Sequence, residues 1–161
     1  MTSPQRAATA ATKTAATPSG CSNFKLRQVA RLATRHFESH VAPLGLKITQ
    51  YSLLSHVLHL GPLRTGELAA AMQLSPSALS RNLRPLLAQG WLEVAAGADA
   101  RSRVVAITAA GREQRGKAQR AWKRAQLDFN QRLGVERVAR LHQLLDECIG
   151  LLGQVEGRHD D

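Results

Sequence analysis

The sequence predicts a mainly α-helical protein that carries one short β-hairpin, and three observations support this fold class. Apolar residues recur every three or four positions over most of the 161 residues. Two short segments, residues 91–95 and 103–107, instead alternate in the manner of paired strands. Glycine and proline stand between the segments, where helices are expected to end.

Two amphipathic helices are expected in the first third of the chain. Residues 22–41 place apolar side chains at helical spacing and arginines on another face. The apolar side consists of Leu26, Val29, Ala30, Ala33, Phe37 and Val41. Pro43 and Gly45 end this helix. Thr49 is expected to cap the next helix, which should stop at Gly61. Its buried side chains would be Tyr51, Leu54, Val57 and Leu58.

Residues 65–90 predict two short helices joined by a turn. Thr65 would cap the first helix, which would bury Leu68, Ala69 and Met72. Ser75 would cap the second, with Pro76 at the first helical position, where its fixed φ and missing N–H are suited. The buried stripe of the second helix would be Leu79, Leu83, Leu86 and Leu87.

The opposite face of this second helix is suited to DNA. It carries Ser77, Ser80, Arg81 and Arg84. Small hydroxyls permit close approach, and guanidinium groups reach guanine edges or phosphates in a major groove. The alternative is an ordinary exposed face, but lysine and glutamate, the usual residues of such a face, are absent from it.

A polar loop separates the two predicted strands. Gly90 is suited to the end of the preceding helix, and residues 97–102 form the loop. A helix-turn-helix followed by such a hairpin is a winged helix, with the loop as its wing. We predict that Arg101 enters the adjacent minor groove and that Asp99 holds its guanidinium in place; the alternative is a solvated pair in a turn. Ser75 and Arg103 complete the candidate DNA-binding residues.

Two longer helices are expected after the hairpin. Thr108 can cap a helix that runs to about Leu133, where Gly134 breaks it. The last helix, about residues 135–155, has a coiled-coil-like seam. The seam consists of Val138, Leu141, Leu145, Cys148, Leu152 and Val155. Three further apolar residues, Leu144, Ile149 and Leu151, widen the apolar surface beyond one packing partner, so a second copy of the chain is a plausible second partner.

These segments resemble the multiple antibiotic resistance regulator (MarR) family. The resemblance is carried by residues 74–90, by Asp99-Ala100-Arg101-Ser102, and by the following strand, which ends in Ile107-Thr108-Ala109-Ala110-Gly111. The wing pattern of that family is Asp-x-Arg-Ser/Arg, followed by a strand that ends in Leu-Thr-x-x-Gly. Residues 45–54 and 121–126 are also similar to one branch, so the resemblance covers about residues 21–155.

The resemblance implies a homodimeric, sequence-specific repressor that binds a palindromic operator in double-stranded DNA and is released by a small-molecule effector. It places the first and last helices at the dimer interface. In this family, small phenolic or aromatic acids bind between the dimerisation helices and the winged helix. The residues that could line such a site are Arg35, His36, Tyr51, Ser55, His59 and Trp122, although all six are equally compatible with ordinary packing and surface positions.

The expected organisation is therefore a tail and three regions. Residues 1–20 form a disordered tail rich in Ala, Thr, Ser and Pro. Residues 21–60 contain the N-terminal helices for dimerisation and support, residues 61–108 the DNA-binding winged helix-turn-helix, and residues 109–157 the C-terminal linker and dimerisation helices.

The charge distribution favours a polyanionic partner over a basic surface that only aids solubility. The net charge is +10; residues 1–60 carry seven Lys/Arg against one acid, and residues 101–132 carry nine against two. Arg112 and Arg115 lie nearest the wing and could contact phosphate, whereas Lys117, Arg120, Lys123 and Arg124 are interpreted as a general electrostatic surface.

Other function classes are weaker. No catalytic arrangement of residues is recognisable, so we expect neither an enzyme nor a bound cofactor. No membrane span or secretion signal is present, and two cysteines give no disulfide framework, which together predict a cytoplasmic protein.

The sequence leaves three alternatives to a ligand-released regulator open: a redox sensor, a metal sensor and an architectural DNA-binding protein. Cys21, near a helix N-terminus and Lys25, could be redox-active, although Asn23 stands where the peroxide-sensing branch of the family has its cysteine. The pairs His36/His40 and His56/His59 have metal-binding spacing but no completing ligand, so no metal site is predicted. A sequence-nonspecific architectural protein is the third alternative.

Overall fold

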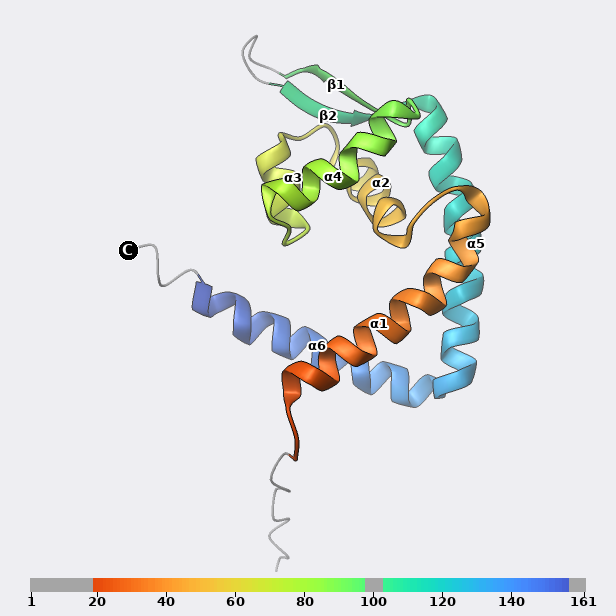
Figure 1. Ribbon diagram of the computed structural model, residues 1–161, viewed down its shortest axis with the longest axis vertical. Coiled ribbons are helices and arrows are strands. Elements are labelled where there is room, and N and C mark those ends of the chain that lie inside the picture. Colours follow the sequence, from red (N-terminus) through yellow and green to blue (C-terminus); the bar gives the residue numbers. More distant parts are fainter. Residues whose placement is uncertain (1–18, 98–102, 157–161) are drawn as a thin grey trace, which may run out of the picture.

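The computed structural model describes residues 19–97 and 103–156 and confirms the mainly α-helical fold with one hairpin (Figure 1). Helix α1 spans Ser22–Val41 and is followed by a 3₁₀ turn, η1, at Ala42–Leu44. Helices α2 (Ile48–Leu60), α3 (Thr65–Ala71) and α4 (Pro76–Ala88) precede strands β1 (Leu92–Ala96) and β2 (Arg103–Ile107). Helices α5 (Ala109–Leu133) and α6 (Val135–Glu156) complete the chain. No helix in the described ranges is both long enough and apolar enough to cross a bilayer.

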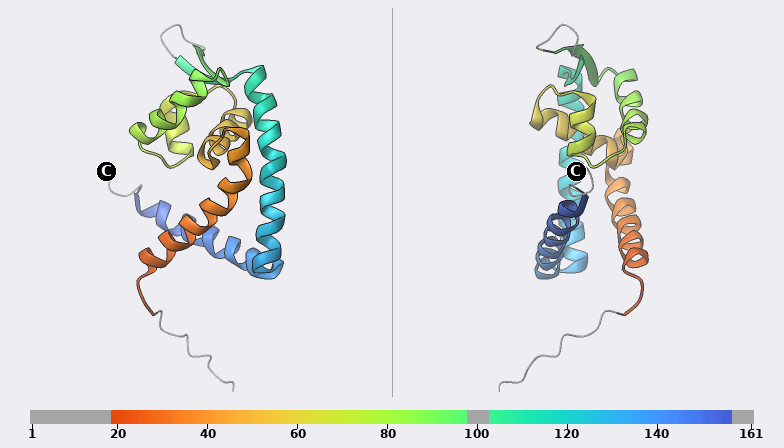
Figure 2. Two further views of the ribbon diagram at one scale, coloured as in Figure 1. Left: turned by 45° about the vertical axis from the view of Figure 1, so that its right-hand side comes forward. Right: turned by 90° about the vertical axis from the view of Figure 1, so that its left-hand side faces the viewer.

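The elements form a globular lobe and a helical arm. Helices α2, α3 and α4 lie together with the hairpin, and α5 runs from the base of the hairpin to the opposite end of the molecule (Figures 1 and 2). There α6 turns back and crosses α1. The described chain thus separates the helix-turn-helix from the two helices expected to dimerise.

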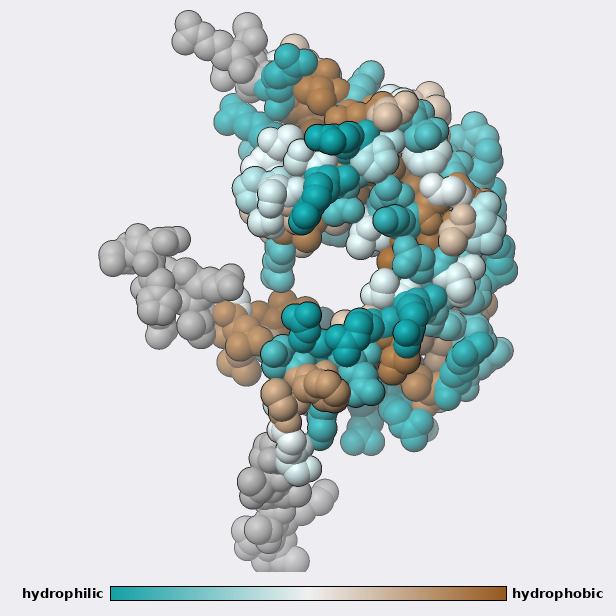
Figure 3. Space-filling view, in the orientation of Figure 1, coloured by the Kyte–Doolittle hydropathy of each residue, from teal (hydrophilic) through white to brown (hydrophobic). Residues whose placement is uncertain are grey.

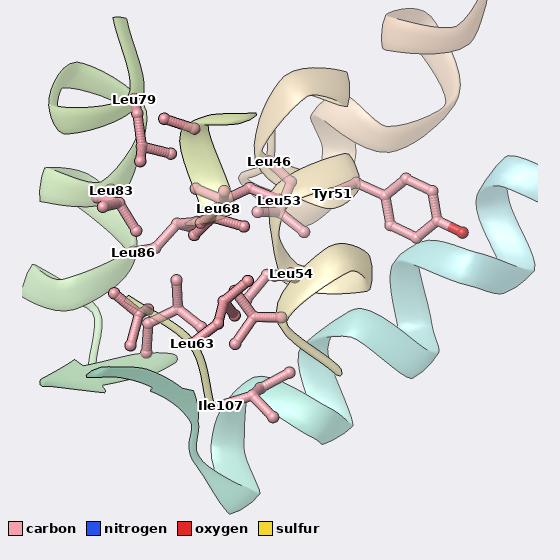
Figure 4. Close-up of a cluster of buried hydrophobic side chains, with 14 of the residues drawn as sticks. Leu46, Tyr51, Leu53, Leu54, Leu63, Leu68, Leu79, Leu83, Leu86 and Ile107 are labelled. Carbon is pink, nitrogen blue, oxygen red and sulfur yellow. The ribbon is translucent and has the colours of Figure 1, made fainter. Parts of the chain in front are cut away.

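Leucine side chains from all layers of the lobe form its core. Leu53 and Leu54 of α2, Leu68 of α3, Leu86 of α4 and Leu92 of β1 are at most 2% exposed. Figure 4 shows the leucines of α4 pointing toward those of α2 and α3. This burial fixes the orientation of α4 and leaves its opposite face in solvent.

A third extended segment, not predicted from the sequence, pairs with the hairpin. β1 and β2 are antiparallel, in a register that runs from Leu92 opposite Ile107 to Ala96 opposite Arg103. Leu63 lies on the other edge of β2, where its N–H donates to the carbonyl oxygen of Val105 (3.3 Å) and its carbonyl oxygen accepts from the Val105 N–H (2.9 Å). The segment before α3 is therefore pinned to the hairpin.

Two of the four predicted threonine and serine caps are correct. Ser75 Oγ accepts from the Ala78 N–H (3.3 Å), and Thr108 Oγ1 accepts from the Gly111 N–H (3.0 Å). The caps predicted at Thr49 and Thr65 are wrong, because both residues lie inside their helices.

At those two helices a longer side chain caps from within the first turn. The Gln50 side chain accepts from the backbone N–H of Lys47 (2.9 Å), and the Glu67 carboxylate accepts from that of Arg64 (2.8 Å). Each bond satisfies a backbone donor just before the helix, which is the reciprocal half of a capping box.

Thr108 joins the end of the helix-turn-helix to the start of α5. Its Oγ1 donates to the carbonyl oxygen of Gly90 (2.7 Å), and its N–H donates to that of Trp91 (3.2 Å). Gly90, at φ +66°, adopts the left-handed conformation predicted for it. Gly111 packs so tightly here that a Cβ atom would stand 2.0 Å from the Trp91 carbonyl oxygen. The hairpin is thus anchored to α5 through backbone contacts.

The apolar faces of α1 and α6 are mostly exposed in the single chain, in contrast to the lobe. Of the predicted apolar side of α1, only Val41 is buried, and of the seam of α6 among residues 135–153, only Val138 is. Cys148, a member of the predicted seam, is exposed. Figure 3 shows hydrophobic residues gathered along α6 and at the start of α1.

Candidate nucleic-acid interface

Helix α4 presents the predicted DNA-reading face to solvent. Leu79, Leu83 and Leu86 are buried against the lobe. The hydroxyl and guanidinium side chains on the other side are all exposed, namely Ser75, Ser77, Ser80, Arg81 and Arg84. No acidic residue occurs in α4, so its charged side chains on this face are all positive. The exposed hydroxyl and guanidinium groups are those that the sequence analysis assigned to major-groove contact.

The position of α4 on α2 involves a residue that the sequence analysis did not single out. Asn82 donates through Nδ2 to the carbonyl oxygen of Ala78 (3.0 Å) and accepts through Oδ1 from Thr49 Oγ1 (3.4 Å). Both ends of the Asn82 side-chain amide are therefore hydrogen-bonded within the lobe, whereas Arg81 and Arg84, close to it in the sequence, are exposed. Pro85 lies inside α4, and the helix continues to Ala88.

The structure describes only the base of the predicted wing, up to residue 97 and from residue 103. Arg103 is exposed at the first position of β2, opposite Ala96. Asp99 and Arg101 lie outside the described residues, so their predicted roles at the minor groove stay predictions. β1 ends and β2 begins at the end of the hairpin remote from α5 (Figure 1).

The six residues proposed for a ligand pocket are not brought together in one cavity. Tyr51 stacks on Trp122, with ring centroids 6.3 Å apart. His36 donates through Nε2 to the carbonyl oxygen of Ala125 (2.8 Å) and packs on Phe37, whereas Arg35 is exposed on α1. None of the six lines the grooves of about 520 and 540 Å³, and Arg35 lines a separate pocket of about 330 Å³ with Ala30, Arg31 and Thr34.

Ser55 and His59 belong to a polar cluster centred on Arg115. The guanidinium donates through Nε to Ser55 Oγ (3.2 Å) and through Nη2 to His59 Nε2 (3.2 Å), and its Nη1 bonds Gln119 Oε1. This cluster ties α2 to α5. Arg115 therefore faces inward, which does not support the phosphate contact predicted for it; Arg112 is exposed.

The remaining candidate residues occupy separate positions. His40 Nδ1 bonds the carbonyl oxygen of His36 (3.1 Å) and His56 Nδ1 that of Ser52 (2.8 Å), and no group of three potential metal ligands occurs in the described part of the chain. Cys21 is exposed at the start of α1, and the nearby Lys25 ammonium donates to the carbonyl oxygen of Ser19 (2.7 Å).

Comparison with known proteins agrees with this geometry. The sequence model of the MarR family matches residues 44–102. The chain is similar to the transcriptional regulator MosR of M. tuberculosis in complex with DNA, at 33% identity over 80% of this chain and 98% of MosR, with a TM-score of 0.63. A MarR mutant from E. coli complexed with operator DNA shares the fold, at 21% identity over 79% of this chain and 92% of that one, with a TM-score of 0.72.

A curated relative matches over a shorter region. The uncharacterized HTH-type transcriptional regulator YwoH of Bacillus subtilis (strain 168) is 26% identical over 84 residues, which are 52% of this chain. The chain spans about three fifths, 61%, of the length of that relative. Taken with the helix-turn-helix and its hairpin, these likenesses show that the chain belongs to the MarR family, whose members are transcriptional regulators and not enzymes.

Proposed function

We propose that this protein is a homodimeric transcriptional repressor that binds a palindromic operator and is released from it by a small aromatic or phenolic effector. The observation that carries the proposal is the exposed face of α4, where Ser77, Ser80, Arg81 and Arg84 meet solvent with no acidic residue beside them in that helix. In the proposed organisation, residues 61–108 read the DNA, residues 21–60 and 109–157 support and join the subunits, and the protein acts in the cytoplasm.

Exposed apolar residues on α1 and α6 support the dimer. Phe24, Leu26, Val29 and Leu32 of α1 are more than half exposed, as are Leu144, Ile149, Leu151 and Leu152 of α6. A groove of about 540 Å³ between α1, α5 and α6 has an almost wholly apolar lining that includes Phe37 and Leu145. An apolar surface of this extent is typical of an interface. A two-fold dimer would double the DNA contacts over a palindrome with half-sites about 10 base pairs apart.

The contact between α2 and α5 supports release by an effector. Tyr51 and Trp122 offer aromatic surface, and Ser55, His59 and Arg115 offer polar groups on the same two helices. Because α5 also anchors the hairpin, a ligand that separates α2 from α5 would move one reading helix relative to the other. Binding to that conformer would lower DNA affinity in proportion to the preference of the ligand for it.

Selection of DNA from a random pool by the purified protein tests the proposal. We expect recovery of one palindrome, bound by two subunits in analytical ultracentrifugation, with an affinity that falls steeply with salt. Recovery of no preferred sequence would instead indicate an architectural protein. Aromatic and phenolic acids would then be screened for release of the selected duplex, with the Cys21→Ser variant and a chelator testing the redox and metal alternatives.

We expect Arg101→Ala to weaken operator binding about tenfold to a hundredfold. The reason is that the enhanced negative potential of a narrow minor groove attracts an inserted guanidinium. The measurement is the Kd of the selected duplex by fluorescence anisotropy at moderate salt. Lys47→Ala, which removes an exposed cation outside the candidate DNA-binding residues, is the comparison that separates a tip contact from a general loss of charge. Unchanged affinity in the Arg101 variant would remove the wing from the proposed interface.

A further inference from the structure

The outer face of α5 carries positively charged side chains that make no hydrogen bond or ion pair with the described part of the lobe or with helices α1 and α6. Five basic residues lie along it, and we call them the basic stripe: Arg112, Lys117, Arg120, Lys123 and Arg124. All five are exposed. The opposite side of the same helix buries Ala118, Ala121 and Ala125 against α1 and α2. The stripe therefore faces away from both neighbouring helices, along the edge of the molecule that α5 forms (Figure 1).

Almost none of this charge is neutralised within the described chain. Only Lys117 has an acidic partner, Glu113, whose carboxylate is 2.8 Å from the ammonium. The hydrogen bond and charge of Lys117 hold the pKa of Glu113 below its usual value. The other four members make no side-chain hydrogen bond or ion pair with residues 19–97 or 103–156.

Other basic residues on the two long helices do find partners or lie among acids. Arg132, further along α5, is 3.3 Å from the carboxylate of Asp128. Helix α6 mixes Glu136, Asp146 and Glu147 with its arginines. On the stripe, in contrast, Arg120 and Arg124 are like charges one helical turn apart, which disfavours the helix unless an anion lies against them. From Arg120 to Arg124 the exposed charges of this face are all positive, which distinguishes it from an ordinary solvated face.

The stripe starts at the DNA-binding lobe. Arg112 lies one turn after Thr108, which is bonded to the backbone between α4 and β1. From Arg112 to Arg124 the helix rises about 18 Å, the length of roughly five base-pair steps. Helices α1 and α6 carry the proposed dimer interface, so this face of α5 would remain open in the dimer.

We infer that the basic stripe of α5 binds the phosphate backbone of DNA that flanks the operator, as a sequence-independent extension of the interface. This inference rests on the proposed function, because the operator fixes which DNA lies beside α5. The flanking duplex would bend toward the stripe, with Arg120, Lys123 and Arg124 as its outermost contacts. The partner is duplex DNA rather than another anion, because the row is linear, largely unpaired and continuous with the lobe.

The test compares two duplexes: the selected palindrome alone, and the palindrome extended by about 15 base pairs on each side. We expect the native protein to bind the extended duplex on the order of tenfold more tightly, with a steeper dependence on salt. The variant Arg120→Gln/Lys123→Gln/Arg124→Gln should bind both duplexes equally and keep the native affinity for the short one. Its salt slope on the extended duplex should fall by about 0.9 for each phosphate that the variant no longer neutralises.

A control variant removes the same charge elsewhere. Lys47→Gln/Arg132→Gln/Arg137→Gln changes three exposed basic residues off the stripe and should keep the advantage of the extended duplex. Equal binding of both duplexes by the native protein, or an equal decrease of affinity in the two variants, would overturn the inference while leaving operator recognition intact. Failure of the short duplex to bind any of the proteins would count against the proposed function instead.

Discussion

Replacing Gly111 by alanine is expected to lower the free energy of unfolding by about 2–3 kcal/mol, and the melting temperature by roughly 5–10 °C. The new Cβ would stand 2.0 Å from the Trp91 carbonyl oxygen and 2.9 Å from the Ile107 side chain. The nearer of these atoms belongs to the backbone and cannot rotate away. Removing the clash therefore requires α5 to move away from the hairpin, which stretches the hydrogen bonds of Thr108 to Gly90 and Trp91. Thermal unfolding followed by circular dichroism measures the effect.

Gly116→Ala is the matched control for this prediction. Gly116 lies in the same helix, and a Cβ there meets no atom within 4 Å. Alanine should stabilise the protein by about 0.5–1 kcal/mol, because glycine in a helix interior is entropically unfavourable. Destabilisation of both variants would show that replacing any glycine in α5 lowers stability, and that the close approach at Gly111 is not the cause.

The hairpin and helix α4 could be predicted because their signals are local. Gly90 and Ser75 act through their own backbone and next few neighbours, and the structure confirms both positions. The alternation of residues 103–107 reflects burial of Val105 and Ile107 on one face. The period of the leucines in α4 likewise decides which of its side chains reach solvent.

Features that depend on distant partners could not be predicted in this way. The pairing of Leu63 with Val105 fixes the chain just before α3, and the Glu67 carboxylate then caps at Arg64, which displaces Thr65 from the cap. Nothing in the neighbourhood of Leu63 indicates that pairing. The same applies to Arg115, whose guanidinium bonds Ser55 and His59 of α2.

The predicted buried sides of α1 and α6 differ from the structure for another physical reason. Helical periodicity reports that a face is apolar and does not report which surface covers it. In the lobe the same chain supplies the cover, and Leu83 and Leu86 are buried. On α6, Leu152 is 69% exposed, and the missing cover is the second subunit in our proposal. The family assignment confirms the prediction of a regulator rather than an enzyme.

Leu145→Glu is expected to convert the dimer to single subunits and to weaken operator binding about a hundredfold or more, because each subunit then holds only one half-site. Leu145 is 38% exposed and lines the groove between α1, α5 and α6. The proposed dimer would bury it, and a carboxylate in this mainly apolar groove would lose hydration that Lys25, the one ammonium among the lining residues, would offset only in part. Light scattering gives the oligomeric state, and anisotropy with the selected duplex gives the affinity.

The same substitution at Leu127 separates loss of the interface from a general effect of a new charge. Leu127 is 63% exposed on α5, outside the helices of the proposed interface, so Leu127→Glu should remain dimeric. Circular dichroism should show equal helix content in both variants, since neither side chain is buried in the single chain. A dimeric Leu145→Glu protein would remove α6 from the interface, and the exposed leucines of α6 would then require a different partner.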